Sequence, residues 1–95
     1  MTETQLKIKV LKYLRDNYPQ YWVYKTHDMF QSGIPDLLLC ADAGKLVAIE
    51  LKAGKNKLTP IQQYVIDKIN SVGGIAGVAR SIDEVKILLD KTKKI

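Results

Sequence analysis

Residues 32–52 read SGIPDLLLCADAGKLVAIELK, two short apolar runs joined by the loop 41–45. The loop contains Asp-Ala-Gly, the composition of a tight connection, so the two runs are predicted to pair as an antiparallel β-hairpin. Asp36 precedes the first run, and Glu50 and Lys52 lie at the end of the second. Antiparallel pairing brings these two ends together. We therefore expect one end of the hairpin to carry two acids and a lysine.

These charged residues have the arrangement of a metal site. Side chains alternate between the faces of a strand, so Glu50 and Lys52 share one face and Leu51 offers its backbone carbonyl nearby. Oxygen atoms from Asp36, Glu50 and the Leu51 carbonyl suit Mg²⁺ or Mn²⁺, which borrow further ligands from water and substrate phosphates. A lysine beside them can orient or deprotonate a water molecule, or stabilise charge on a phosphoryl group. The pattern indicates phosphodiester hydrolysis.

A simpler interpretation exists for each half of the pattern. Asp36 after Pro35 can simply begin a strand. Glu50 and Lys52 can form a solvated pair on an edge strand, which contributes at most about 1 kcal/mol. Neither half alone distinguishes the interpretations, but the two together at this spacing favour the metal site.

The chain resembles the PD-(D/E)XK nuclease superfamily and, within it, the VRR-NUC domain family. Pro35-Asp36 and Glu50-Leu51-Lys52 stand as the two halves of the superfamily motif. The resemblance extends from Glu3 to about Val85. It also rests on Gly33-Ile34, the E-L-K-A-G continuation through Gly54, the segment LTPIQQ at 58–63 and Gly73-Gly74.

The resemblance implies roles for individual residues. Asp36, Glu50 and the Leu51 carbonyl would bind Mg²⁺ or Mn²⁺, and Lys52 would be the catalytic lysine. Two further catalytic residues are implied, an additional acid and a glutamine, at Glu3 and Gln62.

Both additional residues also have a structural explanation. Glu3 lies in the first turn of a predicted helix, where a negative charge is favourable. Gln62 completes a capping box with Thr59. The sequence 77–81, Gly-Val-Ala-Arg-Ser, contains one arginine, Arg80, whose role the resemblance leaves open.

The activity implied by the resemblance is that of a metal-dependent endodeoxyribonuclease. Related stand-alone domains suggest branched DNA, such as a four-way (Holliday) junction, as substrate, and a homodimer as the active form. Two alternatives are a DNA-binding module without catalysis and a nuclease subunit that needs a helicase or another replication or repair protein. The expected location is a bacterial cytoplasm or a phage-infected host cell.

The charge of the chain suits a polyanionic partner. The formal net charge is +5, and thirteen of the fifteen cationic residues are lysines. Lysine lacks the bidentate fork with which arginine recognises guanine, so contacts to the DNA backbone are favoured. Solvation alone also accounts for surface charges. Candidate nucleic-acid contacts are Lys55, Lys57, Lys12, Arg15 and His27.

Length and composition indicate one small domain spanning residues 1–95. A single cysteine, Cys40, excludes an internal disulfide and a multi-cysteine zinc site. We predict that Cys40 is buried within its strand. The sequence shows no membrane-spanning apolar segment and no signal-peptide pattern.

Periodicity and capping signals predict the order helix, three strands, helix, strand, helix. Helices are expected from the Thr2 cap to about Asn17, from the Thr59 cap to Val72, and from Ser81 onward, where Ser81 and Glu84 suggest a capping box. The crossover between the third and fourth strands makes that pair parallel. We therefore predict a three-layer α/β/α restriction-endonuclease-like core, αβββαβα, with a four-stranded mixed sheet.

Overall fold

The computed structural model describes residues 1–27 and 32–93, and it confirms the predicted order of elements. In chain order these are α1 (Glu3–Asn17), β1 (Trp22–Lys25), β2 (Leu37–Cys40), β3 (Leu46–Leu51), α2 (Pro60–Ser71), β4 (Ile75–Ala79) and α3 (Ile82–Asp90). Short 3-10 turns lie between β2 and β3, η1 (Asp42–Gly44), and after α3, η2 (Lys91–Lys93).

The strands form one open mixed sheet in the order β1-β2-β3-β4. β1 and β3 pair antiparallel with β2, whereas β4 pairs parallel with β3 after the crossover through α2. Leu37 lies opposite Ile49, so the same register, continued by one residue, places Asp36 opposite Glu50. The predicted hairpin is therefore confirmed, and its open end carries the expected acids.

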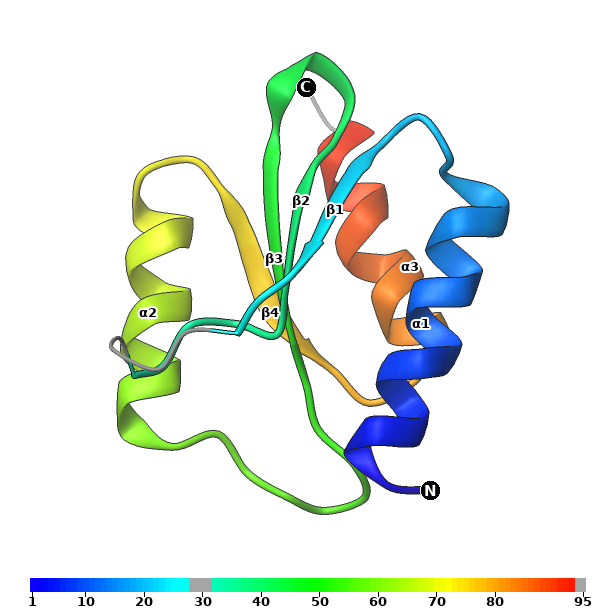
Figure 1. Ribbon diagram of the computed structural model, residues 1–95. Helices are drawn as coiled ribbons and strands as arrows, with labels where there is room; N and C mark the ends of the chain where they lie inside the picture. The colour runs from blue at the N-terminus through cyan, green and yellow to red at the C-terminus, as the bar shows by residue number, and fades with distance from the viewer. Residues whose placement is uncertain (28–31, 94–95) are drawn as a thin grey trace.

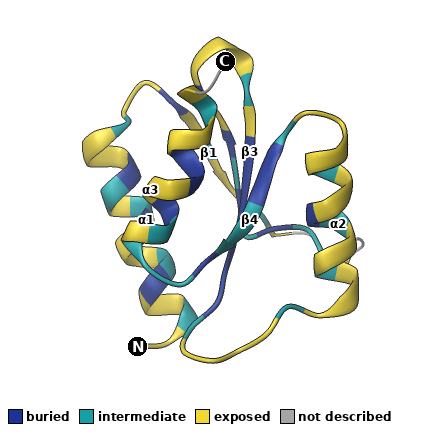
Figure 2. Ribbon diagram, turned by 180° about the vertical axis from the view of Figure 1, so that it is seen from behind, coloured by how far each residue is buried: buried dark blue, intermediate teal, exposed yellow. Residues whose placement is uncertain are grey.

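Helices cover both faces of the sheet, which gives the predicted three layers (Figure 1). α1 and α3 pack on one face, and α2 lies on the other (Figure 2). The larger apolar core includes Ile49 and Leu51 and lies against α1 and α3. A smaller cluster on the opposite face joins Ala48 of β3 to Ile66 of α2. Because side chains alternate along a strand, Glu50 lies on the α2 face with Ala48.

Capping side chains determine where the helices begin. Thr2 and Thr59 each begin a complete capping box, with Gln5 and Gln62 as the reciprocal partners. The box predicted before α3 is incomplete. The Ser81 hydroxyl accepts from the N–H of Glu84, but the Glu84 carboxylate accepts from the N–H of Arg80. The extended backbone at Ser81 (φ −158°) brings that earlier N–H within reach of Glu84.

The prediction that Cys40 is buried is wrong, because its side chain is exposed. Its cross-strand neighbours, Trp22 and Leu46, are exposed as well. α2 packs over Ala48 and Ala76, farther across the sheet, and leaves this corner open. Among the helices of the described segments, none combines the length and apolar character needed to cross a membrane.

Candidate active site

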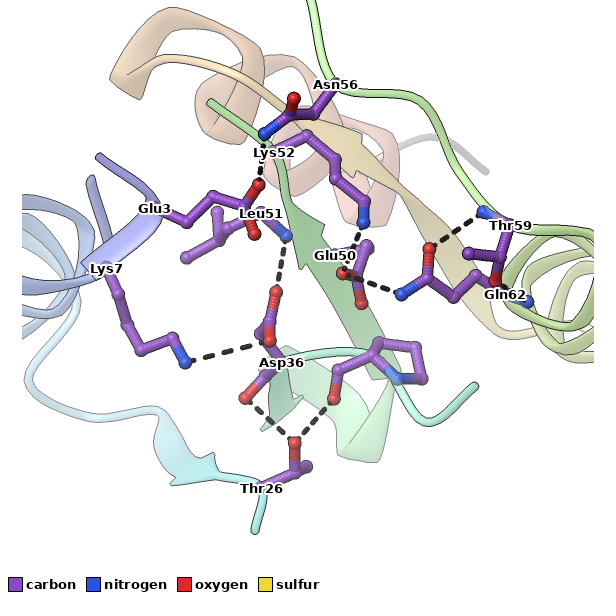
Figure 3. A network of polar contacts seen from close by, with 11 residues as sticks. Glu3, Lys7, Thr26, Asp36, Glu50, Leu51, Lys52, Asn56, Thr59 and Gln62 are labelled. Atoms are coloured by element: carbon purple, nitrogen blue, oxygen red, sulfur yellow. Dashed lines mark hydrogen bonds and ion pairs between the residues drawn. The ribbon is translucent and has the colours of Figure 1, made fainter. Parts of the chain in front are cut away.

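Asp36, Glu50 and Lys52 meet at the end of β3, as the sequence predicts (Figure 3). Lys52 Nζ lies 3.7 Å from Glu50 Oε2. Both residues are buried, with 4% of Glu50 and 9% of Lys52 exposed. A buried acid and a buried lysine are costly unless they are paired, so this arrangement needs the partners that it has.

The backbone of Leu51 also faces this site. Its N–H donates to Asp36 Oδ2 at 2.8 Å, whereas the next N–H, that of Lys52, donates to the Ala79 carbonyl of β4 at 3.2 Å. In a strand the N–H and C=O of one residue point to the same edge. The Leu51 carbonyl therefore points toward the Asp36 side, which suits the predicted ligand role.

The backbone around Asp36 is fixed by the end of β1. Thr26 donates its N–H to the Asp36 carbonyl at 2.9 Å, and its hydroxyl donates to the Pro35 carbonyl at 2.8 Å. From the other side, Lys7 of α1 places Nζ 3.7 Å from Asp36 Oδ1. The Asp36 carboxylate is thereby held between α1 and β3.

Glu50 has an unusual acidity. Its pKa is raised to about 7, chiefly by burial and further by the negative charge of Asp36 and a hydrogen bond with it, while the charge of Lys52 opposes the increase. A bound cation stabilises the ionised form of such a buried carboxyl group, so cation binding and loss of the proton favour each other. The local electrostatics therefore favour a cation between Asp36 and Glu50.

The donor set fits Mg²⁺ or Mn²⁺. Two carboxylates and one carbonyl match the number of protein oxygens that Mg²⁺ usually takes, with water and phosphate as its other ligands. Within residues 1–27 and 32–93, no three acidic, histidine or cysteine side chains converge to hold one ion. The predicted ligand set thus combines two carboxylates, those of Asp36 and Glu50, with one backbone carbonyl, that of Leu51.

Gln62 serves the cap and the site at once. Its Oε1 accepts from the N–H of Thr59 at 3.0 Å, and its Nε2 donates to Glu50 Oε2 at 3.3 Å. The capping contact and a contact with the site carboxylate are therefore both present. The start of α2 is connected to the buried carboxylate.

Glu3 lies beside the site and contacts the loop after β3. Asn56 Nδ2 donates to Glu3 Oε2 at 2.8 Å. This bond, with help from the N–H of Ala53 and the charge of Lys52, lowers the pKa of Glu3 against a partial desolvation. The ionised Glu3 in turn contributes to the raised pKa of Glu50.

The sequence profile of the VRR-NUC domain matches residues 3–83, most of the chain. The chain belongs to the VRR-NUC domain family. A solved structure described as a VRR_NUC domain is 25% identical, covers 95% of this chain and 97% of its own, and has a TM-score of 0.72. A second, a VRR_NUC domain protein, is 22% identical, covers 95% and 86%, has a TM-score of 0.73, and shows the shared fold.

Comparison with curated protein sequences gives no significant match. Membership of the VRR-NUC family makes this chain a nuclease-type, DNA-processing domain, which implies that it binds DNA.

The predicted nucleic-acid residues of this VRR-NUC domain fall into two groups, one near the site and one farther from it. The group near the site consists of Lys55, Lys57 and His27. Lys55 and Lys57 are exposed in the loop directly after Lys52, next to the site. His27 is exposed just beyond Thr26, at the edge of the described segment.

Lys12 and Arg15 belong to the second group and lie farther along α1. Lys12 forms an ion pair with Asp16 on an exposed face of the helix. Arg15 follows Lys7 by eight residues, which is about 12 Å along the helix axis. The fold does not bring this pair to the carboxylates.

Three contacts of the VRR-NUC site were not expected from the sequence, those of Lys7, Thr26 and Asn56. The contact of Lys7 has a signal in the sequence. Glu3 and Lys7 are four residues apart and therefore share a face of α1. No comparable pattern points to Thr26 or Asn56, whose partners lie nine and 53 residues away in the chain.

Proposed function

We propose that this VRR-NUC domain is a metal-dependent endodeoxyribonuclease that hydrolyses DNA phosphodiester bonds. One observation carries the proposal. Glu50 is buried opposite Asp36, its pKa is raised to about 7, and the Lys52 ammonium lies beside it. An ion pair with a purely structural role needs only Glu50 and Lys52. The second carboxylate, that of Asp36, makes ionisation of Glu50 less favourable.

Each residue has a part in the proposed reaction. Asp36, Glu50 and the Leu51 carbonyl hold Mg²⁺ or Mn²⁺, which supplies Lewis-acid chemistry at the scissile phosphate. Lys52, fixed beside Glu50, orients the attacking water and stabilises negative charge that develops on the phosphoryl oxygens. Gln62 holds the Glu50 carboxylate in place through its amide.

The bond changes are those of in-line hydrolysis. The water oxygen gives up one proton to solvent and forms a bond to phosphorus as the bond from phosphorus to the 3′-oxygen breaks. The products are a 5′-phosphate and, once the leaving oxygen has taken a proton, a 3′-hydroxyl. This polarity follows the usual behaviour of the PD-(D/E)XK superfamily that the sequence resembles.

The proposed substrate is branched DNA such as a four-way junction, and the proposed active form is a homodimer with one site per subunit. Resemblance to stand-alone VRR-NUC domains supports both points. The lysine-rich composition supports contacts with the DNA backbone rather than with particular bases. The alternative within the same family is a nuclease subunit that acts only with a helicase or another repair protein.

Cleavage assays test the proposal. Purified protein is incubated with linear, flap and four-way DNA in Mg²⁺, Mn²⁺ or EDTA. Asp36→Asn is the site variant, and Asp90→Asn, an exposed residue at the end of α3, is the matched control. We expect metal-dependent cleavage by the wild type and Asp90→Asn, and none by Asp36→Asn.

Other outcomes of these assays are equally informative. No cleavage of any substrate by the wild type alone would contradict an autonomous enzyme, and restored cleavage with a helicase would support the subunit alternative. Equal activity in Asp36→Asn would contradict the assignment of the site. A monomer in light scattering, with and without DNA, would contradict the homodimer.

A further inference from the structure

The loop between β3 and α2, residues 53–58, is fixed at several points although it contains no helix or strand. We call it the basic loop. The Gly54 carbonyl accepts from Arg80 Nη1 at 2.9 Å. Asn56 donates its side-chain amide to Glu3 at 2.8 Å and its backbone N–H to the Ala53 carbonyl at 3.1 Å. The loop is therefore connected to the end of β4 and to the first turn of α1.

Arg80 is itself held in a defined position. Its backbone N–H donates to the Glu84 carboxylate at 2.9 Å, so the side chain that reaches Gly54 starts from a fixed point. Gly54 has φ +54°, and a Cβ there would meet no atom within 4 Å. The turn needs glycine for its backbone conformation and not for space. The turn at Gly54 thereby directs the Gly54 carbonyl toward the Arg80 side chain.

The basic loop carries one lysine on each side of Asn56. Lys55 and Lys57 are both exposed. Neither forms an ion pair with a residue of the segments 1–27 and 32–93. The nearby carboxylate of Glu3 already accepts a hydrogen bond from the Asn56 side chain. The two ammonium groups are therefore available to an external anion close to Lys52.

We propose that Arg80 and Asn56 are positioning residues that hold the basic loop in the shape in which Lys55 and Lys57 contact phosphates of the DNA backbone. This inference rests on the proposed function, because it takes DNA as the substrate. Arg80 and Asn56 act through the loop and do not touch DNA. A loop ordered before binding loses less conformational entropy on binding, so releasing it weakens the complex even when both lysines remain.

Asn56→Ala gives the cleanest test, because it removes the bond to Glu3 without changing any charge. The control is Asn17→Ala, which removes a similar side-chain bond to the Tyr13 carbonyl at the other end of α1. DNA affinity is measured by fluorescence anisotropy in EDTA. We expect roughly three- to ten-fold weaker binding for Asn56→Ala and wild-type binding for the control. Wild-type affinity in Asn56→Ala would overturn the proposal.

A double-mutant cycle separates an indirect role of Arg80 from a direct one. Arg80→Met is measured alone and together with Lys55→Ala and Lys57→Ala, with Lys68→Met as the control for loss of a charge at the end of α2. If Arg80 acts through the loop, its effect largely disappears once both lysines are absent. Independent effects that multiply would show that Arg80 contacts DNA itself and would overturn the proposal.

Amide hydrogen exchange examines the loop without DNA. We expect the amides of residues 53–58 to exchange faster in Asn56→Ala and Arg80→Met, while those of β3 keep wild-type protection. Unchanged exchange in both variants, with normal DNA binding by the wild type, would overturn the positioning role alone. Absence of DNA binding by the wild type would instead contradict the proposed function.

Discussion

The two faces of the sheet differ in what they bury, although β3 contributes to both. Ile49 and Leu51 are fully buried against α1 and α3. Ala48 and Glu50 alternate with them on the α2 face, followed by Lys52, and the apolar cluster there is small. Because strand side chains alternate, a single strand can stabilise the fold with one set of residues and carry chemistry with the other. The division predicts that substitutions on the two faces have different consequences.

Lys52→Met gives the largest expected effect on activity among the substitutions that compare the two faces of the sheet. Loss of the ammonium beside Glu50 should slow DNA cleavage roughly 10²- to 10³-fold, or about 3–4 kcal/mol in the activation free energy. Single-turnover cleavage measures the rate, and urea denaturation measures the stability. If Lys52→Met loses activity only because it is less stable, the proposed functional difference between the two faces of the sheet would be contradicted.

Ile49→Ala tests the opposite face. A fully buried isoleucine in the larger core should cost about 4 kcal/mol in the free energy of unfolding. The matched change, Ile66→Ala in the smaller cluster on the α2 face, should cost about 2 kcal/mol, because that cluster packs fewer apolar groups. Urea denaturation compares the two, and equal losses would show that the faces contribute equally to stability.

Glu50→Gln should change how stability depends on pH. The fold raises the pKa of Glu50 from 4.5 to about 7, so between these values the folded protein binds a proton more tightly than the unfolded chain. The stabilisation is complete below pH 4.5 and is lost as pH rises to 7, a loss of about 3 kcal/mol. Urea denaturation in EDTA from pH 5 to 8 should show this loss in the wild type but not in the variant. Parallel pH profiles would contradict it.

Gly33→Ala tests the contact between the segment before Asp36 and α2. Gly33 has φ +82°, and a Cβ there would lie 2.9 Å from the Ile61 carbonyl oxygen. We expect a loss of about 2 kcal/mol in stability. Gly44→Ala is the control, because Gly44 has φ +73° with nothing near its Cβ, and it should cost about 1 kcal/mol. Equal losses would show that the clash with α2 is absent.

The hairpin and its charged residues could be predicted because they follow local rules. Strand alternation puts Glu50 and Lys52 on one face, and a short antiparallel connection brings Asp36 to them. The structure confirms that arrangement. The alternation of buried apolar residues and charged site residues along β3 could thus be predicted from the spacing of its residues.

Other contacts of the site depend on how distant elements pack. Asn56 and Glu3 are 53 residues apart, and Lys7 meets Asp36 only because α1 lies against this end of the sheet. The burial of Cys40 was predicted wrongly because the sequence does not tell how far α2 extends over the sheet. Helix position relative to a sheet is a property of the whole core, so no local pattern gives it.

A crystal of the protein soaked in Mn²⁺ tests the central claim most directly. An anomalous difference map should show manganese between the Asp36 and Glu50 carboxylates and the Leu51 carbonyl, and the peak should be absent in Asp36→Asn. Manganese bound only elsewhere, or a peak that persists in Asp36→Asn, would contradict a metal site at the end of β3.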